Sequence, residues 1–411
     1  DKLSNQFLPT FSKLDDVRGS NSIEFPFIDI QDGTGNNTQY MSLGYELFTW
    51  NNAVHNTIAN IKDDITYYVG SHKVTAGLSY EYQMADNAYM RNGTGYYRCA
   101  SVDDFVNGAA PEVVCLTYGD GGEKNPAGRV QFSKLGLYAQ DDWNPTENFK
   151  LTYGVRFDGL FFNNSDLMTN KAILDLDYYD SNNDVRHIDT GKWPSAGISV
   201  SPRVGFKWDV LNDKSLTLRG GTGLFVGRLP LVFFTNMPTN SGMVQYQAQI
   251  NAKNAEKKGF TMDTFKGGLV TDANGKATTQ ALLDKLYTLG YPKTITPEDG
   301  TVPSSISAVD SKFKMPQVWK TSLAVDYQLP VSFPFTVTVE GIFNKTINGV
   351  MMSDWSMLPA EGFARWNGAD NRPVFPSNFR NATKAFVLEN TSKGYGYSAN
   401  VTVNMRPVEG L

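Results

Sequence analysis

The sequence predicts an all-β protein that folds as an antiparallel transmembrane β-barrel, and three observations point to this fold class. Polar and apolar residues alternate along segments of about 10 to 13 residues, which exceed the usual strands of soluble sheets and fit a tilted membrane crossing. Short turns and long polar loops alternate between these segments. Aromatic residues lie beside the short turns. Outer-membrane barrels combine short periplasmic turns, long extracellular loops and aromatic girdles at the interfaces.

The composition favours strands over helices. Aromatic residues make up 13% of the chain, with 20 Tyr and 25 Phe, and there are 37 Gly, which suit strands and turns. The mean hydropathy is -0.34, and no run approaches the roughly 20 apolar residues of a transmembrane helix. A helical membrane protein is therefore excluded, whereas alternating barrel strands average out to such a hydropathy. The net charge of -5 has no long basic run behind it, which excludes a nucleic-acid-binding surface.

The domain organisation follows from this alternation. Residues 1–37 are predicted to form a loop or edge segment with an extended patch at 23–30, and residues 38–411 are predicted to form the barrel portion. In chain order, the predicted strands are 40–50, 63–70, 73–84, 131–143, 150–162, 201–210, 215–227, 317–329, 333–346 and a last one from 397. The predicted extracellular loop regions are about 87–129, 163–199, 228–316 and 349–390. These strands amount to about 10 to 12.

The segment 150–162 carries the alternation that assigns the two faces. It lies between a tight turn and a long loop, so its apolar positions are predicted to face lipid: Leu151, Tyr153, Val155 and Phe157. A soluble sheet would instead bury these residues in a core. Eight charged residues fall in the opposite phase and are predicted to face a lumen: Glu81, Arg156, Asp158, Arg203, Lys207, Asp209, Asp326 and Glu340. Each of them fits a solvated or salt-bridged wall residue better than a ligand contact.

Two further features support the barrel hypothesis. Four aromatic residues sit beside short turns, as in an interfacial girdle: Trp143, Trp208, Tyr327 and Phe333. Aromatic residues also cap the core of any large β protein, so one such residue would not favour a barrel. Their occurrence at four turns does favour it. The segment 276–291 is predicted to form one short amphipathic helix, with leucines at helical spacing and Gly290 as its stop. Without a basic stripe, this helix is expected to pack in a small loop subdomain.

The sequence offers no catalytic or metal-binding pattern. The three histidines, His55, His72 and His187, are scattered and have no zinc-ligand spacing. Asp141 and Asp142 are adjacent on a predicted strand, so they point to opposite faces and cannot act as one acid/base pair. We therefore predict that the chain is not an enzyme and needs no cofactor or metal.

The only cysteines, Cys99 and Cys115, lie in a polar, Gly-rich segment. Their proximity predicts a local disulfide in an oxidising compartment, and the alternative is two free thiols. No signal peptide precedes Asp1, so we expect either a mature protein or a piece of a longer one.

Four segments carry a resemblance to a known family: 64–82, 135–158, 201–210 and 215–236. They look like the barrel of TonB-dependent outer-membrane receptors of Bacteroidetes type, especially the Oar-like branch. The resemblance covers most of 63–236 and resumes from about Pro316. It implies a barrel of about 22 strands, an N-terminal plug domain and import of a bulky nutrient with energy from TonB. The chain shows no plug, no TonB-contacting box and no terminal aromatic residue, so we expect an internal barrel portion.

These inferences predict an outer-membrane transport protein of a Gram-negative cell, which captures a bulky nutrient with its loops and passes it through a polar lumen. The predicted partners are outer-membrane lipid and, from the resemblance alone, TonB and a plug. A surface lipoprotein or another macromolecular ligand is a further candidate partner. One alternative is a passive outer-membrane channel or surface adhesin. A third hypothesis is a soluble β-rich carbohydrate-binding or hydrolytic protein.

Overall fold

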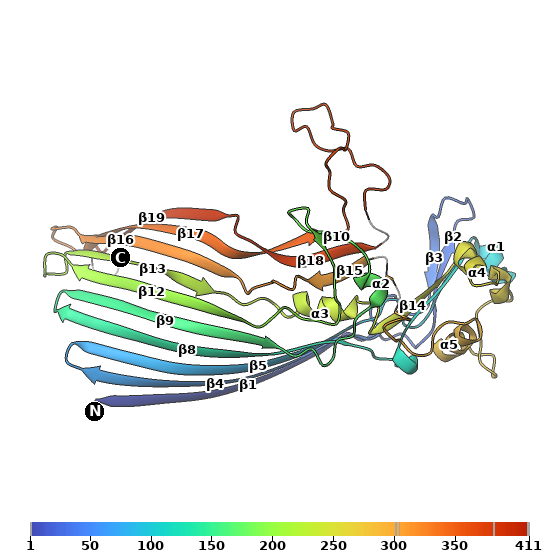
Figure 1. Cartoon of the computed structure of the whole chain (residues 1–411), viewed down its shortest axis with the longest axis horizontal. Coiled ribbons are helices and arrows are strands. Elements are labelled where there is room, and N and C mark those ends of the chain that lie inside the picture. Colours follow the sequence, from blue (N-terminus) through green and yellow to red (C-terminus); the bar gives the residue numbers. More distant parts are fainter. Residues whose placement is uncertain (1, 301, 304, 381–382, 409–411) are drawn as a thin grey trace.

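A twelve-stranded sheet dominates the computed structural model, which describes residues 2–300, 302–303, 305–380 and 383–408 (Figure 1). Ten strands form one antiparallel series: β1 (Leu3–Val17), β4 (Asn52–Val69), β5 (His72–Tyr89), β8 (Gly128–Thr146), β9 (Phe149–Phe162), β12 (Gly197–Asp209), β13 (Leu216–Val226), β16 (Gln317–Gln328), β17 (Phe335–Asp354) and β19 (Tyr395–Met405). The far half of β17 also pairs with β18 (Lys384–Thr391), which pairs in parallel with β15 (Ser305–Val309). The prediction of a β-barrel sheet is confirmed.

The connections are sorted by length between the two ends of the sheet. Short turns join β4 to β5, β8 to β9, β12 to β13 and β16 to β17, and all four lie at the left end in Figure 1. The turn that joins β4 to β5 passes through Gly70, whose φ of 57° lies in the left-handed region that glycine adopts without strain. The long segments between the hairpins gather at the opposite end, which we call the loop end. The predicted loop regions include residues 301, 304, 381 and 382, which lie outside the described residues.

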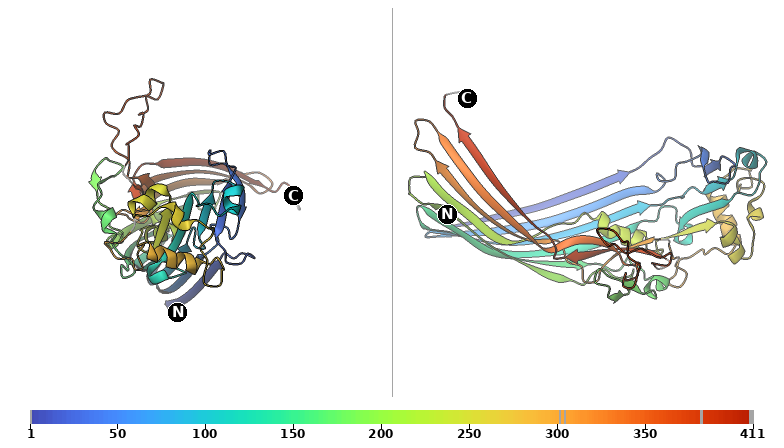
Figure 2. Two further views of the ribbon diagram at one scale, coloured as in Figure 1. Left: turned by 90° about the vertical axis from the view of Figure 1, so that its right-hand side faces the viewer. Right: turned by 90° about the horizontal axis from the view of Figure 1, so that it is seen from above.

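The sheet is curved but does not close (Figure 2). Among the described residues, β1 pairs only with β4 and β19 pairs only with β17. Each of these strands therefore presents one row of backbone donors and acceptors without a ladder partner.

The first 37 residues contain more structure than the sequence predicts. The predicted extended patch overlaps β2 (Phe27–Gln31), but β1 spans 15 residues where the sequence predicts a loop or edge segment. The alternation of β1 is hidden because Asn5, Lys13 and Asp15 share the register phase of its apolar positions. The weak alternation over 40–50 corresponds to β3 (Gln39–Leu43) followed by turns.

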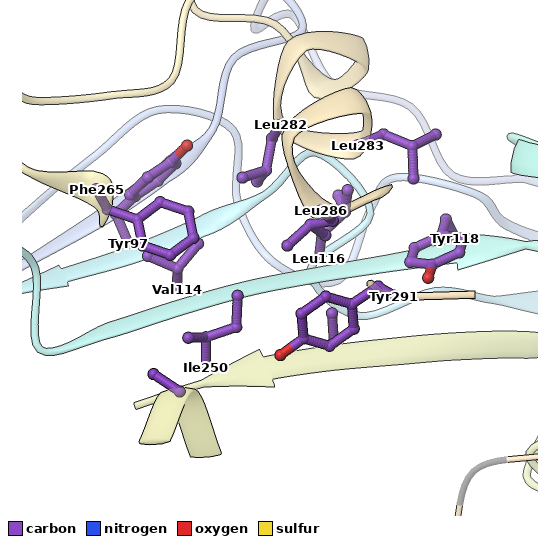
Figure 3. Close-up of a cluster of buried hydrophobic side chains, with 12 residues drawn as sticks. Tyr97, Val114, Leu116, Tyr118, Ile250, Phe265, Leu282, Leu283, Leu286 and Tyr291 are labelled. Carbon is purple, nitrogen blue, oxygen red and sulfur yellow. The ribbon is translucent and has the colours of Figure 1, made fainter. Parts of the chain in front are cut away.

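A second sheet of five strands lies beyond the loop end of the large one (Figures 1 and 2). Its order is β14 (Gln245–Ile250), β7 (Val113–Gly119), β6 (Tyr96–Cys99), β2 and β3. The helix α5 (Thr279–Thr288) packs on it through Leu282 and Leu286, which are fully buried with Leu116 and Ile250 in one apolar cluster (Figure 3). This sheet, α5 and the cluster form what we call the outer subdomain.

The predicted amphipathic helix is therefore confirmed as α5. Its first turn is capped by the Thr278 hydroxyl, which accepts a hydrogen bond from the Ala281 amide, and Gly290 follows it with a φ of 78°. The sequence predicts a single helix, but the loops hold further short ones: α1 (Val102–Val106), α2 (Lys171–Leu174), α3 (Val232–Thr239), α4 (Ala252–Lys257) and the 3₁₀ turns Asp120–Gly122 and Met262–Phe265. The short strands β10 (Tyr178–Tyr179) and β11 (Val185–Arg186) pair with each other.

The helix α3 lies against β5 and β8 near the loop end. Its Phe234 is fully buried among aromatic rings, with centroids 5.4 Å from Phe162 and 6.0 Å from Phe313. The Trp193 ring belongs to the same cluster. No helix in the described part of the chain is long and apolar enough to cross a membrane.

Candidate functional site

The register of the large sheet sorts its side chains into two faces. Arg156 on β9 lies opposite Tyr138 on β8 and Ser201 on β12, whereas Phe157 lies opposite Leu137 on β8. Directly opposed residues point to the same side of a sheet, so the register can be followed from strand to strand. We call the side that carries Arg156 the polar face and the side that carries Phe157 the apolar face.

The predicted residues divide between these faces without exception. All eight predicted lumen residues share the polar face: Glu81, Arg156, Asp158, Arg203, Lys207, Asp209, Asp326 and Glu340. The four predicted lipid residues share the apolar face: Leu151, Tyr153, Val155 and Phe157. The residues that alternate along the sequence therefore lie on the two opposite faces of the folded sheet. Which face lines a lumen and which contacts lipid stays a prediction.

The aromatic residues beside the short turns follow the same division. Trp143, Trp208 and Tyr327 lie on the apolar face at the end of the sheet that carries the turns. Phe333 lies in a turn and stacks on Phe335 at 6.0 Å between ring centroids. Trp143 stacks on His72 at 5.5 Å.

A connected network of charges crosses β4, β8 and β9 on the polar face. The Tyr138 hydroxyl donates to the Asp64 carboxylate, and the Arg156 guanidinium lies 5.0 Å from the centroid of the Tyr138 ring. Arg156 Nε also donates to Asp158 at 2.9 Å, and Lys134 Nζ lies 3.6 Å from the same carboxylate. Asp158 is only 6% exposed, and these cations compensate its charge.

Glycines make room for this network. A Cβ atom at Gly136 would lie 2.1 Å from Arg156 Nη2, and one at Gly77 would lie 2.3 Å from the Tyr138 ring. A glycine within a strand marks such close approaches, so these two positions are the sequence signal for the contact between Tyr138 and Arg156. The alternation of polar and apolar residues alone does not reveal that contact.

A second network lies on β13, β16 and β17. Arg219 Nε lies 2.9 Å from Asp326, and its Nη1 lies 3.4 Å from Glu340. The Thr338 hydroxyl donates to the other oxygen of Asp326 at 2.7 Å. Two of the predicted lumen carboxylates are therefore joined by one guanidinium.

Near the loop end, the polar face is covered by a packed segment of the chain. The segment that follows β13 turns back over β5 and β8, and Arg228 Nη2 lies 2.5 Å from the Glu81 carboxylate. Gln83 Nε2 donates to the other oxygen of Glu81 at 2.5 Å, and Glu81 itself is 6% exposed. A cavity of about 550 Å³ remains between this segment and the sheet, lined mainly by apolar atoms. We call it the inner cavity.

A second recess of about 600 Å³ lies over the middle of the polar face. Residues from seven strands line it, from Gln140 on β8 to Ser398 on β19. We call this recess the central hollow. A further recess of about 540 Å³ lies over β4, β5, β8 and β9 and is lined largely by residues of the apolar face such as Leu78, Leu137 and Phe157.

The adjacent carboxylates Asp141 and Asp142 point to opposite faces, as predicted. Asp141 accepts hydrogen bonds from His72 at 2.6 Å and from the Tyr153 hydroxyl at 2.9 Å on the apolar face. Asp142 accepts from Thr152 at 2.6 Å on the polar face. Among the described residues, no group of histidine, cysteine and carboxylate side chains is arranged to hold a metal ion.

The predicted disulfide between Cys99 and Cys115 is contradicted, since both thiols are free and buried. Cys115 lies opposite Tyr96 in the pairing of β6 with β7, and Cys99 is three residues farther along β6. That offset separates the two cysteines by about 10 Å along the strand, beyond the Cα separation of roughly 4.4 to 6.8 Å that a disulfide bridges. The short separation of the two cysteines in sequence suggests that they lie close together, but the register of β6 with β7 keeps them apart.

Both thiols are expected to resist alkylation in the folded protein. Burial raises the pKa of Cys99 to about 11 and that of Cys115 to about 12, which leaves little reactive thiolate at about pH 8. Mass spectrometry after iodoacetamide treatment should find an unlabelled native protein and two labels after denaturation without reductant. A denatured protein that takes up no label until it is reduced would instead establish the disulfide.

A comparison with models of known protein families shows to which family the chain belongs. The family model described as an outer membrane beta barrel domain matches residues 4–411, which is nearly the whole chain. The chain belongs to this family. It is therefore an outer-membrane protein, as the sequence predicts. No curated protein matches the chain.

Solved structures of outer-membrane transporters and receptors are similar to this outer membrane beta barrel domain at low sequence identity, and the first of those described here shares its fold. The outer membrane transporter YddB from Escherichia coli matches with a TM-score of 0.52 and 12% identity, over 98% of this chain and 37% of that protein. The ferric enterobactin receptor PfeA from Pseudomonas aeruginosa, in a mutant form, has a TM-score of 0.44 and 10% identity, over 99% and 39%. The Serratia marcescens hemophore receptor HasR has a TM-score of 0.39 and 11% identity, over 98% and 46%. These proteins are transporters or receptors, and the chain spans less than half the length of each.

Proposed function

We propose that this outer membrane beta barrel domain is part of a transporter, in which the polar face lines a passage and the apolar face contacts lipid. The observation that carries the proposal is the inner covering of the polar face, where the segment after β13 and α3 pack against the wall and leave the inner cavity. A barrel with a protein segment packed inside it admits solutes selectively, because a solute must pass that segment or displace it. The eight charged wall residues supply a hydrated surface for that passage.

The resemblance of segments such as 135–158 and 215–236 to TonB-dependent receptors of Bacteroidetes type, Oar-like ones in particular, supports a finer form of the proposal. In that form, a plug domain and TonB act together with this portion of the barrel, and the long loops capture a bulky nutrient. The chain then acts as a binding and transport unit and not as an enzyme. The fold shared with the transporter YddB also supports a role in transport.

Uptake by the producing cell tests this function and identifies the transported compound in the same experiment. Cells with and without the gene are grown in a medium of mixed bulky nutrients, and the compounds that disappear are measured by mass spectrometry. We expect at least one compound to be consumed only when the gene is present, and a protonophore that removes the energy source of TonB should abolish its uptake. Uptake that persists with the protonophore would support a passive channel, and unchanged uptake with loss of surface attachment would support an adhesin.

A further inference from the structure

The bottom of the central hollow, which we call its floor, is formed by glycine backbone without side chains. Gly154 on β9, Gly205 on β12 and Gly221 on β13 all line it from the polar face, and Gly205 lies opposite Gly221 in the register. Glycine leaves the backbone of three neighbouring strands without side chains, so the recess reaches down to the sheet itself. A group bound here would lie against the wall and not in the middle of the passage.

Two cations stand at the rim of this hollow. The Arg203 guanidinium lies 4.4 Å from the centroid of the Phe225 ring, and Lys320 Nζ lies 5.9 Å from the same centroid. Arg203, Lys320 and Phe225 all line the hollow. One aromatic ring therefore holds both cations near each other, although like charges repel.

Neither cation has a carboxylate partner among the residues that the structure describes. Five other basic residues of the polar face each lie within 4 Å of a carboxylate: Lys62, Lys134, Lys150, Arg156 and Arg219. Lys73 and Lys207 of the same face have no such ion pair among the described residues, but they do not line the hollow. Glu340 also lines the hollow, but Arg219 holds it at 3.4 Å. The uncompensated charge in the hollow is therefore positive.

We propose that the central hollow is a binding site for an oxyanion, a carboxylate or phosphate group of the transported compound, held between Arg203 and Lys320. Arg203 offers a planar pair of N–H donors that matches either group, and Lys320 adds a second charge. The glycine floor provides the space that such a group needs. This inference rests on the proposed transport function, since it names the chemistry of the solute that passes the wall.

Titration calorimetry on the full, detergent-solubilised protein tests the site, with citrate and inorganic phosphate as probes and the uncharged trimethyl ester of citrate as the control compound. We expect saturable citrate binding that weakens as sodium chloride is raised. Arg203→Gln and Lys320→Gln should each weaken it about tenfold, which corresponds to the loss of one charged hydrogen bond. Lys73→Gln removes the same charge from the polar face beside a short turn and should leave citrate affinity unchanged.

A further variant tests the contribution of the recess separately from that of the two cations. The Cβ of residue 205 would lie 3.4 Å from its nearest neighbour atom, which is an ordinary van der Waals contact. Gly205→Leu should therefore weaken citrate binding by filling the floor while both cations remain. Equal citrate affinity in the wild type, Arg203→Gln and Lys320→Gln would overturn the proposal, and so would a wild type that binds neither probe. If neither probe binds while gene-dependent uptake persists, the transported compound uses no oxyanion here. If citrate binds but no uptake depends on the gene, the transport function falls and the anion site stands.

Discussion

Replacing Phe157 by Arg is expected to destabilise the protein in lipid by about 2 to 4 kcal/mol, because a charged side chain near the middle of a lipid-facing barrel strand must leave water. Phe157 lies about midway along β9 on the apolar face and is 45% exposed, so the loss of internal packing contributes little. Urea unfolding in lipid vesicles, followed by tryptophan fluorescence, measures the change in the free energy of unfolding.

The matched control is Gln140→Arg on the neighbouring strand β8. Gln140 lies on the polar face and lines the central hollow, so an arginine there stays hydrated if this face lines a passage. Its free energy of unfolding should change by less than about 0.5 kcal/mol, as for exposed sites. If Gln140→Arg costs as much as Phe157→Arg, or more, the lipid and lumen faces are assigned the wrong way round.

Replacing Phe234 by Ala is expected to cost about 3 to 5 kcal/mol and to release α3 from the wall. Phe234 is fully buried, and its ring is tilted against Phe162 and meets Trp193 and Phe313 edge on. The lost contacts join α3 to Phe162 at the end of β9 and to Trp193 and Phe313 in the neighbouring loops, so the effect should be local. Amide hydrogen exchange should therefore accelerate over residues 232–239, while β4 and β9 keep their protection.

Phe375→Ala provides the comparison for this core substitution. Phe375 also packs against two aromatic rings, Phe363 and Phe379, but it remains 44% exposed in the irregular segment after β17. We expect its loss to cost less than about 1 kcal/mol and to leave α3 protected. Equal exchange rates over 232–239 in the wild type and Phe234→Ala would show that the aromatic cluster does not hold α3.

The parts of the fold that sequence can predict are those governed by a local period. Alternation with a period of two follows from strand geometry, so Arg156 and Phe157 are assigned to opposite faces without any information on strand pairing. The spacing of Leu282 and Leu286 in the same way predicts the buried side of α5. Each of these predictions needs only the residues of one element.

The features that sequence cannot predict depend on pairing between distant segments. The register of β6 with β7 decides that Cys99 and Cys115 stay apart, and nothing in their spacing specifies that register. The contact between Arg228 and Glu81 joins residues 147 positions apart, so no local pattern signals it. The same holds for Arg203 and Lys320, which both approach the Phe225 ring only in the folded sheet.

The outer subdomain also constrains the order in which the molecule assembles. Its sheet pairs β14 with β7, and β2 with β6, across long stretches of chain, whereas each hairpin of the large sheet joins neighbours. Contacts with small sequence separation form faster than distant ones. The hairpins β4–β5 and β8–β9 are therefore expected to form before β14 docks on β7.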